Sequence, residues 1–131
     1  MGRILVLLAA SLALAACTGS APVPEPAVDT DCGTFDVPLG QTLPESATRC
    51  LVEAVRAERS ARLRETRYTD EGDPVPVTYT AGAGGRVEVV TDSRQDAFGE
   101  RNVTSQTCTG LSVDAGQLSF ADCSEPTPTR G

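Results

Sequence analysis

The sequence predicts an α+β domain in which one N-terminal helix packs on an antiparallel sheet of four to five strands, stapled by two disulfides. Three observations support this prediction. Residues 44–58 repeat apolar side chains with a helical period, several later segments alternate apolar and polar residues, and the body of the chain holds an even set of four cysteines.

The first 16 residues have the plan of a secretory signal peptide. Arg3 precedes a run of apolar and small residues that is too short for a membrane span. The run ends in Leu14-Ala15-Ala16-Cys17, which resembles the lipobox of bacterial lipoproteins. That resemblance implies that Cys17 carries the lipid and becomes the first residue of a mature protein on the extracytoplasmic face of the cell membrane.

The chain is accordingly divided into four parts. Residues 1–16 are the lipoprotein signal peptide, 17–31 are the lipidated cysteine and a Pro-rich tether, 32–123 are a single α+β domain, and 124–131 are a disordered tail. At roughly 3.1 Å per residue, an extended tether holds the domain up to about 40 Å from the lipid head groups.

Composition excludes several function classes. The chain has 18 acidic and 11 basic residues and a net charge of −7, which disfavours nucleic acid and anionic lipid as partners of the protein surface. Membrane attachment must then come from the acyl chains on Cys17. There is no His and every basic residue is Arg, so Ser/His/Asp and Cys/His catalysis are impossible. We predict that the protein is not an enzyme and has no cofactor.

Four cysteines remain for disulfides: Cys32, Cys50, Cys108 and Cys123. They allow three connectivities, and we favour sequential pairing because it closes the shortest loops. A zinc site needs close pairs such as C-x-x-C, which these spacings do not offer. A free, buried Cys50 that acts as a small hydrophobic residue is the alternative.

The first half of the domain contains an edge strand, the helix and a second strand. Residues 32–39 alternate as a short strand, and Pro38 keeps it at the edge of the sheet. The helix over 44–58 begins with Pro44 and carries Cys50 in its apolar stripe, so a bridge to Cys32 clamps the edge segment onto the helix. Residues 61–69 predict a strand with a bulge near Arg64-Glu65, where the alternation breaks.

A first hairpin follows the turn at 71–74. Val75, Val77 and Tyr79 alternate with polar residues, and a Gly-rich turn over 81–85 leads to Val87 and Val89. We expect Tyr79 to oppose Val87 and Val77 to oppose Val89. One face of this hairpin is then wholly apolar.

A second hairpin turns over residues 114–117. Its predicted register places Cys108 opposite Cys123 and Leu111 opposite Phe120, which supports the second disulfide. Strict alternation would point the two cysteines away from Leu111 and Phe120. Either the bridge lies on the outer face, or Gly110 marks a bulge that turns it inward.

Residues 92–99 form the candidate binding loop, with Asp92, Arg94 and Asp96 as its candidate binding residues and Phe98 expected to plug into the core. Calcium is the alternative reading of its oxygen ligands, but the spacing does not match the 12-residue calcium loop. The carboxylates over 70–73 are typical of a turn rather than of acid–base catalysis. We therefore predict no metal site.

Four segments of the body carry a family resemblance: Cys50-Leu51-x-x-Ala54 in the helix, the 71–74 turn, the 85–89 strand and the 92–99 loop. In these the chain resembles small, uncharacterised secreted proteins and lipoproteins of actinobacteria, over about residues 32–108. The resemblance implies no activity and no catalytic residues. We predict a monomeric, lipid-anchored cell-envelope protein that is a non-enzymatic interaction or binding module with an envelope protein as partner. The alternative is a small-ligand-binding or enzyme-inhibitor module.

Overall fold

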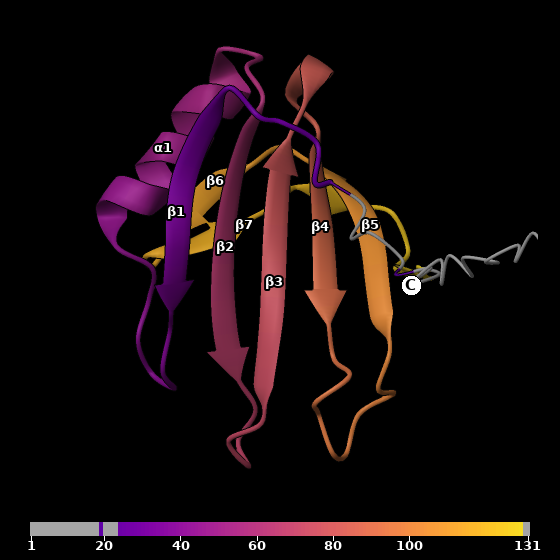
Figure 1. The fold of residues 1–131 in the computed structure, drawn as a ribbon. Coiled ribbons are helices and arrows are strands. Elements are labelled where there is room, and N and C mark those ends of the chain that lie inside the picture. The colour runs from indigo at the N-terminus through magenta and orange to yellow at the C-terminus, as the bar shows by residue number, and fades with distance from the viewer. Residues whose placement is uncertain (1–18, 20–23, 130–131) are drawn as a thin grey trace, which may run out of the picture.

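The structure of this chain is a computed structural model that describes residue 19 and residues 24–129. The predicted signal peptide and Cys17 lie outside the described residues. The described part is mostly β, with a mixed sheet of seven strands, a separate two-stranded hairpin and one short α-helix (Figure 1). The prediction of an α+β domain with an antiparallel sheet of four to five strands is therefore wrong.

The elements follow in simple order along the chain. They are β1 (Thr30–Asp36), α1 (Glu45–Arg56), β2 (Ala61–Tyr68), β3 (Pro74–Ala81), the 3-10 turn η1 (Ala83–Gly85), β4 (Val87–Asp92), β5 (Val103–Thr109), β6 (Ser112–Asp114), β7 (Gln117–Ser119), β8 (Asp122–Cys123) and β9 (Thr127–Pro128). The main sheet has the order β1-β2-β3-β4-β5-β8, with β9 also paired to β5. The predicted helix and the predicted strand over 61–69 are confirmed to within two residues at each end.

The sheet is mixed because α1 connects β1 to β2 along the chain. A strand, helix and strand in succession return the chain to the same end of the sheet, so the two strands run parallel. β1 is at the edge, as Pro38 predicted. The bulge lies in β1, between Asp31 and Thr34, whereas β2 pairs with β3 without a shift. The bulge predicted near Arg64-Glu65 is therefore wrong.

The last residues extend the sheet beyond β5. β8 pairs with β5 through Cys108 and Cys123, and β9 pairs with it through Ser105 and Thr127. Beyond β9, the N–H of Thr129 donates to the carbonyl of Val103 at 2.8 Å. Residues 124–129 thus lie along β5 instead of forming the expected disordered tail, while 130–131 lie outside the described residues. These strands are exposed, so they lack the apolar alternation that reveals a half-buried strand.

The first hairpin has a register shifted by two residues from the predicted one. Tyr79 opposes Val89 and Ala81 opposes Val87, because β3 continues through Ala81 before the chain turns. Gly84 and Gly85, with φ of +70° and +68°, make that turn possible. An even shift keeps every side chain on its face, so the predicted apolar face survives.

The second hairpin leaves the main sheet at Gly110. This residue has φ of +66°, and a Cβ there would lie 2.5 Å from the Cβ of Ala121, so only glycine fits. β6 and β7 then fold over the sheet, where Leu111 and Phe120 pack against the core while Cys108 is itself fully buried. The inward turn at Gly110 is thus the alternative that the structure adopts.

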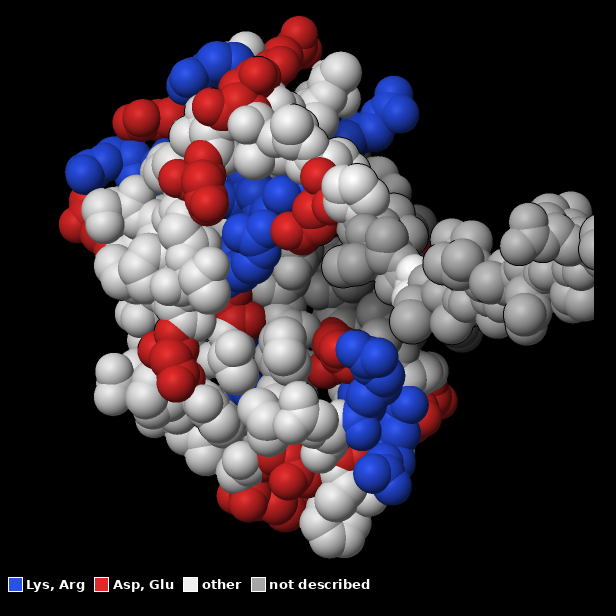
Figure 2. Space-filling view, in the orientation of Figure 1, with Lys and Arg blue, Asp and Glu red and all other residues white. Residues whose placement is uncertain are grey.

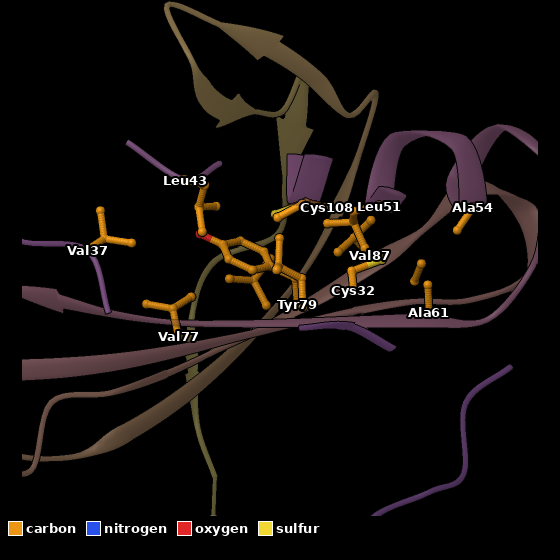
Figure 3. Packing of buried hydrophobic residues seen from close by; sticks show 14 residues of the cluster. Cys32, Val37, Leu43, Leu51, Ala54, Ala61, Val77, Tyr79, Val87 and Cys108 are labelled. Carbon is orange, nitrogen blue, oxygen red and sulfur yellow. The ribbon is translucent and has the colours of Figure 1, made fainter. Parts of the chain in front are cut away.

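The core lies between one face of the sheet and a layer made of α1 and the β6–β7 hairpin. Figure 3 views this arrangement with the sheet nearly edge-on and the helix and hairpin above it. Two disulfides are present, in the sequential pairing that the sequence favours. Cys32–Cys50 joins β1 to α1, whereas Cys108–Cys123 links the paired strands β5 and β8 within the main sheet. The buried apolar residues are Cys32, Val37, Leu43, Ala47, Leu51, Ala54, Ala61, Leu63, Val77, Tyr79, Ala81, Val87, Val89 and Cys108.

Candidate functional site

One pocket lies where the loop after β1, strand β2 and the tip of the β6–β7 hairpin meet. Its volume is about 170 Å³. Apolar, polar and charged side chains all contribute to its wall, and the two charged ones belong to neighbouring inward positions of β2 and bond to each other. The lining residues are Val37, Pro38, Leu39, Gly40, Gln41, Thr42, Leu43, Glu65, Arg67, Tyr68, Gln117 and Leu118.

Glu65 is the buried charge of this pocket. Its position in β2 points the side chain toward the core layer, and only 3% of the residue is exposed. The hydroxyl of Tyr79 donates to Glu65 Oε1 at 2.6 Å, and Nε of Arg67 donates to the same oxygen at 2.7 Å. Oε2 of Glu65 has no hydrogen bond to any described residue. The carboxylate therefore keeps one acceptor oxygen for the pocket.

Arg67 completes a three-residue network. Its Nη2 donates to the Tyr79 hydroxyl at 2.8 Å and also contacts Glu65 Oε1. Burial opposes the charged guanidinium, but the hydrogen bonds to Glu65 and Tyr79 and the negative charge of Glu65 outweigh it, so the pKa of Arg67 is raised. The pKa of Tyr79 is raised as well, first by burial and then by its hydrogen bond to Glu65. The network thus holds a neutral phenol between two charged groups.

The raised pKa of Tyr79 makes a testable prediction about alkaline pH. Folding favours the neutral phenol, so this stabilising contribution is fully present below the unfolded pKa near 10 and is lost as the pH rises through the folded pKa. The chain has two Tyr and no Trp, so a Tyr68→Phe variant reports Tyr79 alone by the ultraviolet absorbance of phenolate. We expect ionisation only together with alkaline unfolding, and a reversible titration near pH 10 in the folded variant would contradict the network.

A second, shallower hollow adjoins the pocket. It has a volume of about 300 Å³ and is lined by Asp36, Pro38, Leu39, Tyr68 and Gly72. Leu39, Pro38 and Tyr68 belong to both hollows, and Leu39 is 57% exposed. The hydrogen bond to Asp36 raises the pKa of Tyr68. An exposed leucine thus separates two adjoining hollows at this end of the sheet.

The predicted binding loop lies elsewhere, between β4 and β5, and its charged residues bond to groups within the loop. Arg94 donates to both carboxylate oxygens of Asp92, from Nε at 2.9 Å and from Nη2 at 2.6 Å, and this lowers the pKa of Asp92. Asp96 accepts from the backbone N–H groups of Phe98 and Gly99. Phe98 is 81% exposed, so its predicted place in the core is wrong. These contacts order the loop through its own residues.

Within residue 19 and residues 24–129, no three or more acidic, Cys or His side chains come together as a metal site would need. In the same part of the chain, no helix has both the length and the apolar character that crossing a membrane requires.

Glu65 and Arg67 were not among the site residues predicted from the sequence. The alternation of β2 continues through Ala61, Leu63 and Glu65, so Glu65 occupies an inward position where an apolar residue is expected. A polar residue at this position looks like a break in the apolar alternation, which is why the sequence suggested a bulge there. A carboxylate in a core position of a regular strand was the signal available in the sequence.

The end of the predicted tether is docked on the open face of the sheet, where the N-terminal segment crosses the strands in Figure 1. Glu25 pairs with Arg64 at 2.6 Å, and Arg62 donates to the carbonyl of Pro26 at 2.7 Å. Asp29 bonds twice with Ser60, through its backbone N–H and its carboxylate. Figure 2 shows basic side chains in the upper part of this face with acidic ones beside them. Residues 25–29 of the predicted tether thus bond to the folded domain.

Comparison with known families gives one match. The model of a family described as a domain of unknown function (DUF4362) matches residues 46–119, which is more than half of the chain. The matched segment runs from α1 to β7 and includes Glu65, Arg67 and Tyr79. Neither the curated proteins nor the solved structures include a match to this chain. The chain belongs to the DUF4362 family.

Proposed function

We propose that this protein is a lipid-anchored envelope lipoprotein whose folded domain is a non-enzymatic binding module. The observation that carries the proposal is the use of the five cysteines. Four of them are bonded to one another inside the domain, which leaves Cys17, at the end of a signal-like segment, as the sulfur available for lipid. Disulfides are typical of proteins outside the cytoplasm, which fits an exported chain.

The docked tether limits how far the domain can lie from the membrane. If Cys17 is lipidated, residues 18–24 alone separate the anchor from the first docked residues, since Glu25 and Pro26 are fixed to β2. Seven extended residues span at most about 25 Å, which is less than the reach of about 40 Å expected from the sequence. The domain is then kept close to the bilayer, with the open face of the sheet tied to the anchor.

Binding suits the pocket better than catalysis. The Glu65 carboxylate is held by a guanidinium and a phenol, and the chain has neither His nor Lys to act as a second acid or base near neutral pH. A carboxylate fixed in this way presents an acceptor oxygen to a ligand. Apolar walls around a few fixed polar groups are the usual composition of a ligand pocket.

A protein partner in the envelope is the second candidate function, and Phe98 is the observation that favours it. An aromatic side chain that is 81% exposed at the tip of an ordered loop is typical of a protein contact. A photo-cross-linking residue at position 98 should capture one envelope protein on intact cells, whereas the same residue at Val113 should not. Equal capture from both positions would contradict a partner at this loop.

The anchor is tested by a Cys17→Ala variant in cells. We expect loss of fatty-acid labelling and release of the protein from the membrane fraction, because two or more acyl chains supply the attachment and the acidic surface supplies none. A Thr18→Ala variant is the matched control and should stay in the membrane. Retention of the Cys17→Ala protein in the membrane would contradict the proposal.

A further inference from the structure

We infer that the pocket between the 37–43 loop and the β6–β7 hairpin binds a small zwitterion with an apolar body, the chemical class of a free α-amino acid such as valine. The inference rests on the proposed function, since it names the ligand class of the proposed binding module. Three features carry it: a charge of each sign at one end, apolar walls and a small volume.

The charged end offers an acceptor and a donor side by side. Glu65 receives its hydrogen bonds from Arg67 and Tyr79 on Oε1, which leaves Oε2 to accept from an ammonium group. Arg67 uses Nε and Nη2 within the network, and its Nη1 has no hydrogen bond to a described residue. The Arg67 side chain is 48% exposed, so Nη1 can donate to a carboxylate. These two groups complement the two ends of a zwitterion.

A ligand with a single charge fits this end poorly. A cation would approach Glu65 but would also meet the like charge of Arg67, and an anion would approach Arg67 but meet Glu65. A purely apolar ligand would strip water from both groups and leave them without partners. Because the pair has no net charge, a ligand that carries both signs satisfies both residues and leaves neither unpaired.

The rest of the pocket selects a short apolar body. Val37, Leu39, Leu43 and Leu118 form apolar walls, and the hydroxyl end of Tyr79 points toward Leu43 (Figure 3). A volume of about 170 Å³ holds about six groups of the size of water. A small aliphatic amino acid matches a space of this size.

The test compares three probes of matched shape by calorimetric titration of the mature lipoprotein in a mild detergent. L-Valine carries both charges, isobutylamine lacks the carboxylate, and 3-methylbutanoate lacks the ammonium. We expect valine to bind about tenfold or more tightly than either analogue, because each analogue leaves one charged group of the pocket without a partner. Equal binding of all three, or no binding of valine at millimolar concentration, would overturn the inference.

Two substitutions locate the binding. Glu65→Gln should abolish the preference for valine over 3-methylbutanoate, while Glu88→Gln, an exposed residue of β4, should leave it unchanged. Because Glu65 is buried, a second variant avoids the core: Leu39→Asp should weaken valine binding about tenfold, while Val113→Asp, also exposed, should not. Unchanged binding in Leu39→Asp would overturn the site even if Glu65→Gln fails to fold.

Nuclear magnetic resonance of the unmodified protein gives a readout that needs no variant. Titration with valine should move backbone signals of residues 37–43 and 117–118, and shifts spread over the open face of the sheet would contradict the site. The outcome is separable from the anchor. If valine fails to bind while Cys17→Ala still releases the protein, this inference falls and the lipid anchor stands.

Discussion

Replacement of both Cys32 and Cys50 by Ala should lower the free energy of unfolding by about 3 kcal/mol. This disulfide closes a loop of 18 residues, and its removal restores the conformational freedom of that loop in the unfolded chain. It also frees β1, an edge strand that pairs with β2 alone, from the helix that covers it. For a small domain this is a large share of the total stability. Urea unfolding monitored by circular dichroism measures it.

The second disulfide provides the control for this prediction. Cys108–Cys123 closes a loop of 15 residues, so its removal should cost a similar amount through the unfolded chain, about 3 kcal/mol. Because Cys108 is fully buried, its loss should add a packing penalty that the Cys32 and Cys50 pair does not share to the same extent. A decrease of less than about 1 kcal/mol in the free energy of unfolding of both double variants would contradict the structural role of the disulfides.

Leu51→Ala should destabilise the domain by about 2–5 kcal/mol. Leu51 lies in α1 with no exposed surface and fills the space between the helix and the sheet. Its truncation removes buried methyl groups and leaves a cavity in a core that contains no Trp and little aromatic bulk. The difference in urea midpoint between this variant and the unmodified domain measures the loss in the free energy of unfolding.

Leu39→Ala is the matched control, since it makes the same chemical change at a residue that is 57% exposed. We expect its effect on stability to stay within about 0.5 kcal/mol. A Leu51→Ala variant as stable as Leu39→Ala would mean that α1 does not pack on the sheet as described.

Local patterns in the sequence predicted the local structure well. The stripe through Ala47, Leu51 and Ala54 located the helix, and alternation located β2, β3 and β4. These signals exist because each element buries one face. The same signal was absent from β8 and β9, whose residues are exposed, and the parallel pairing of β1 with β2 depends on where α1 returns the chain. For these reasons the sequence led to an antiparallel α+β sheet instead of the mixed, mostly β one.

The candidate site was harder to predict than the fold. Asp92, Arg94 and Asp96 drew attention because charged residues cluster in the sequence there, yet they pair locally. Glu65 and Tyr79 lie 14 residues apart on neighbouring strands, and their contact arises only when β2 pairs with β3. The pocket further needs the 37–43 loop and the hairpin tip, which meet through tertiary packing alone. Clusters of charged residues along the sequence do not indicate which distant segments come into contact in the fold.

The most direct test of the central claim is the intact mass of the mature protein purified from the membrane fraction. We expect a chain that begins at Cys17, carries a diacylglyceryl group and fatty acid on that residue, and has its other four cysteines oxidised. A soluble cytosolic chain that still begins at Met1 and has all 5 cysteines as free thiols would contradict it.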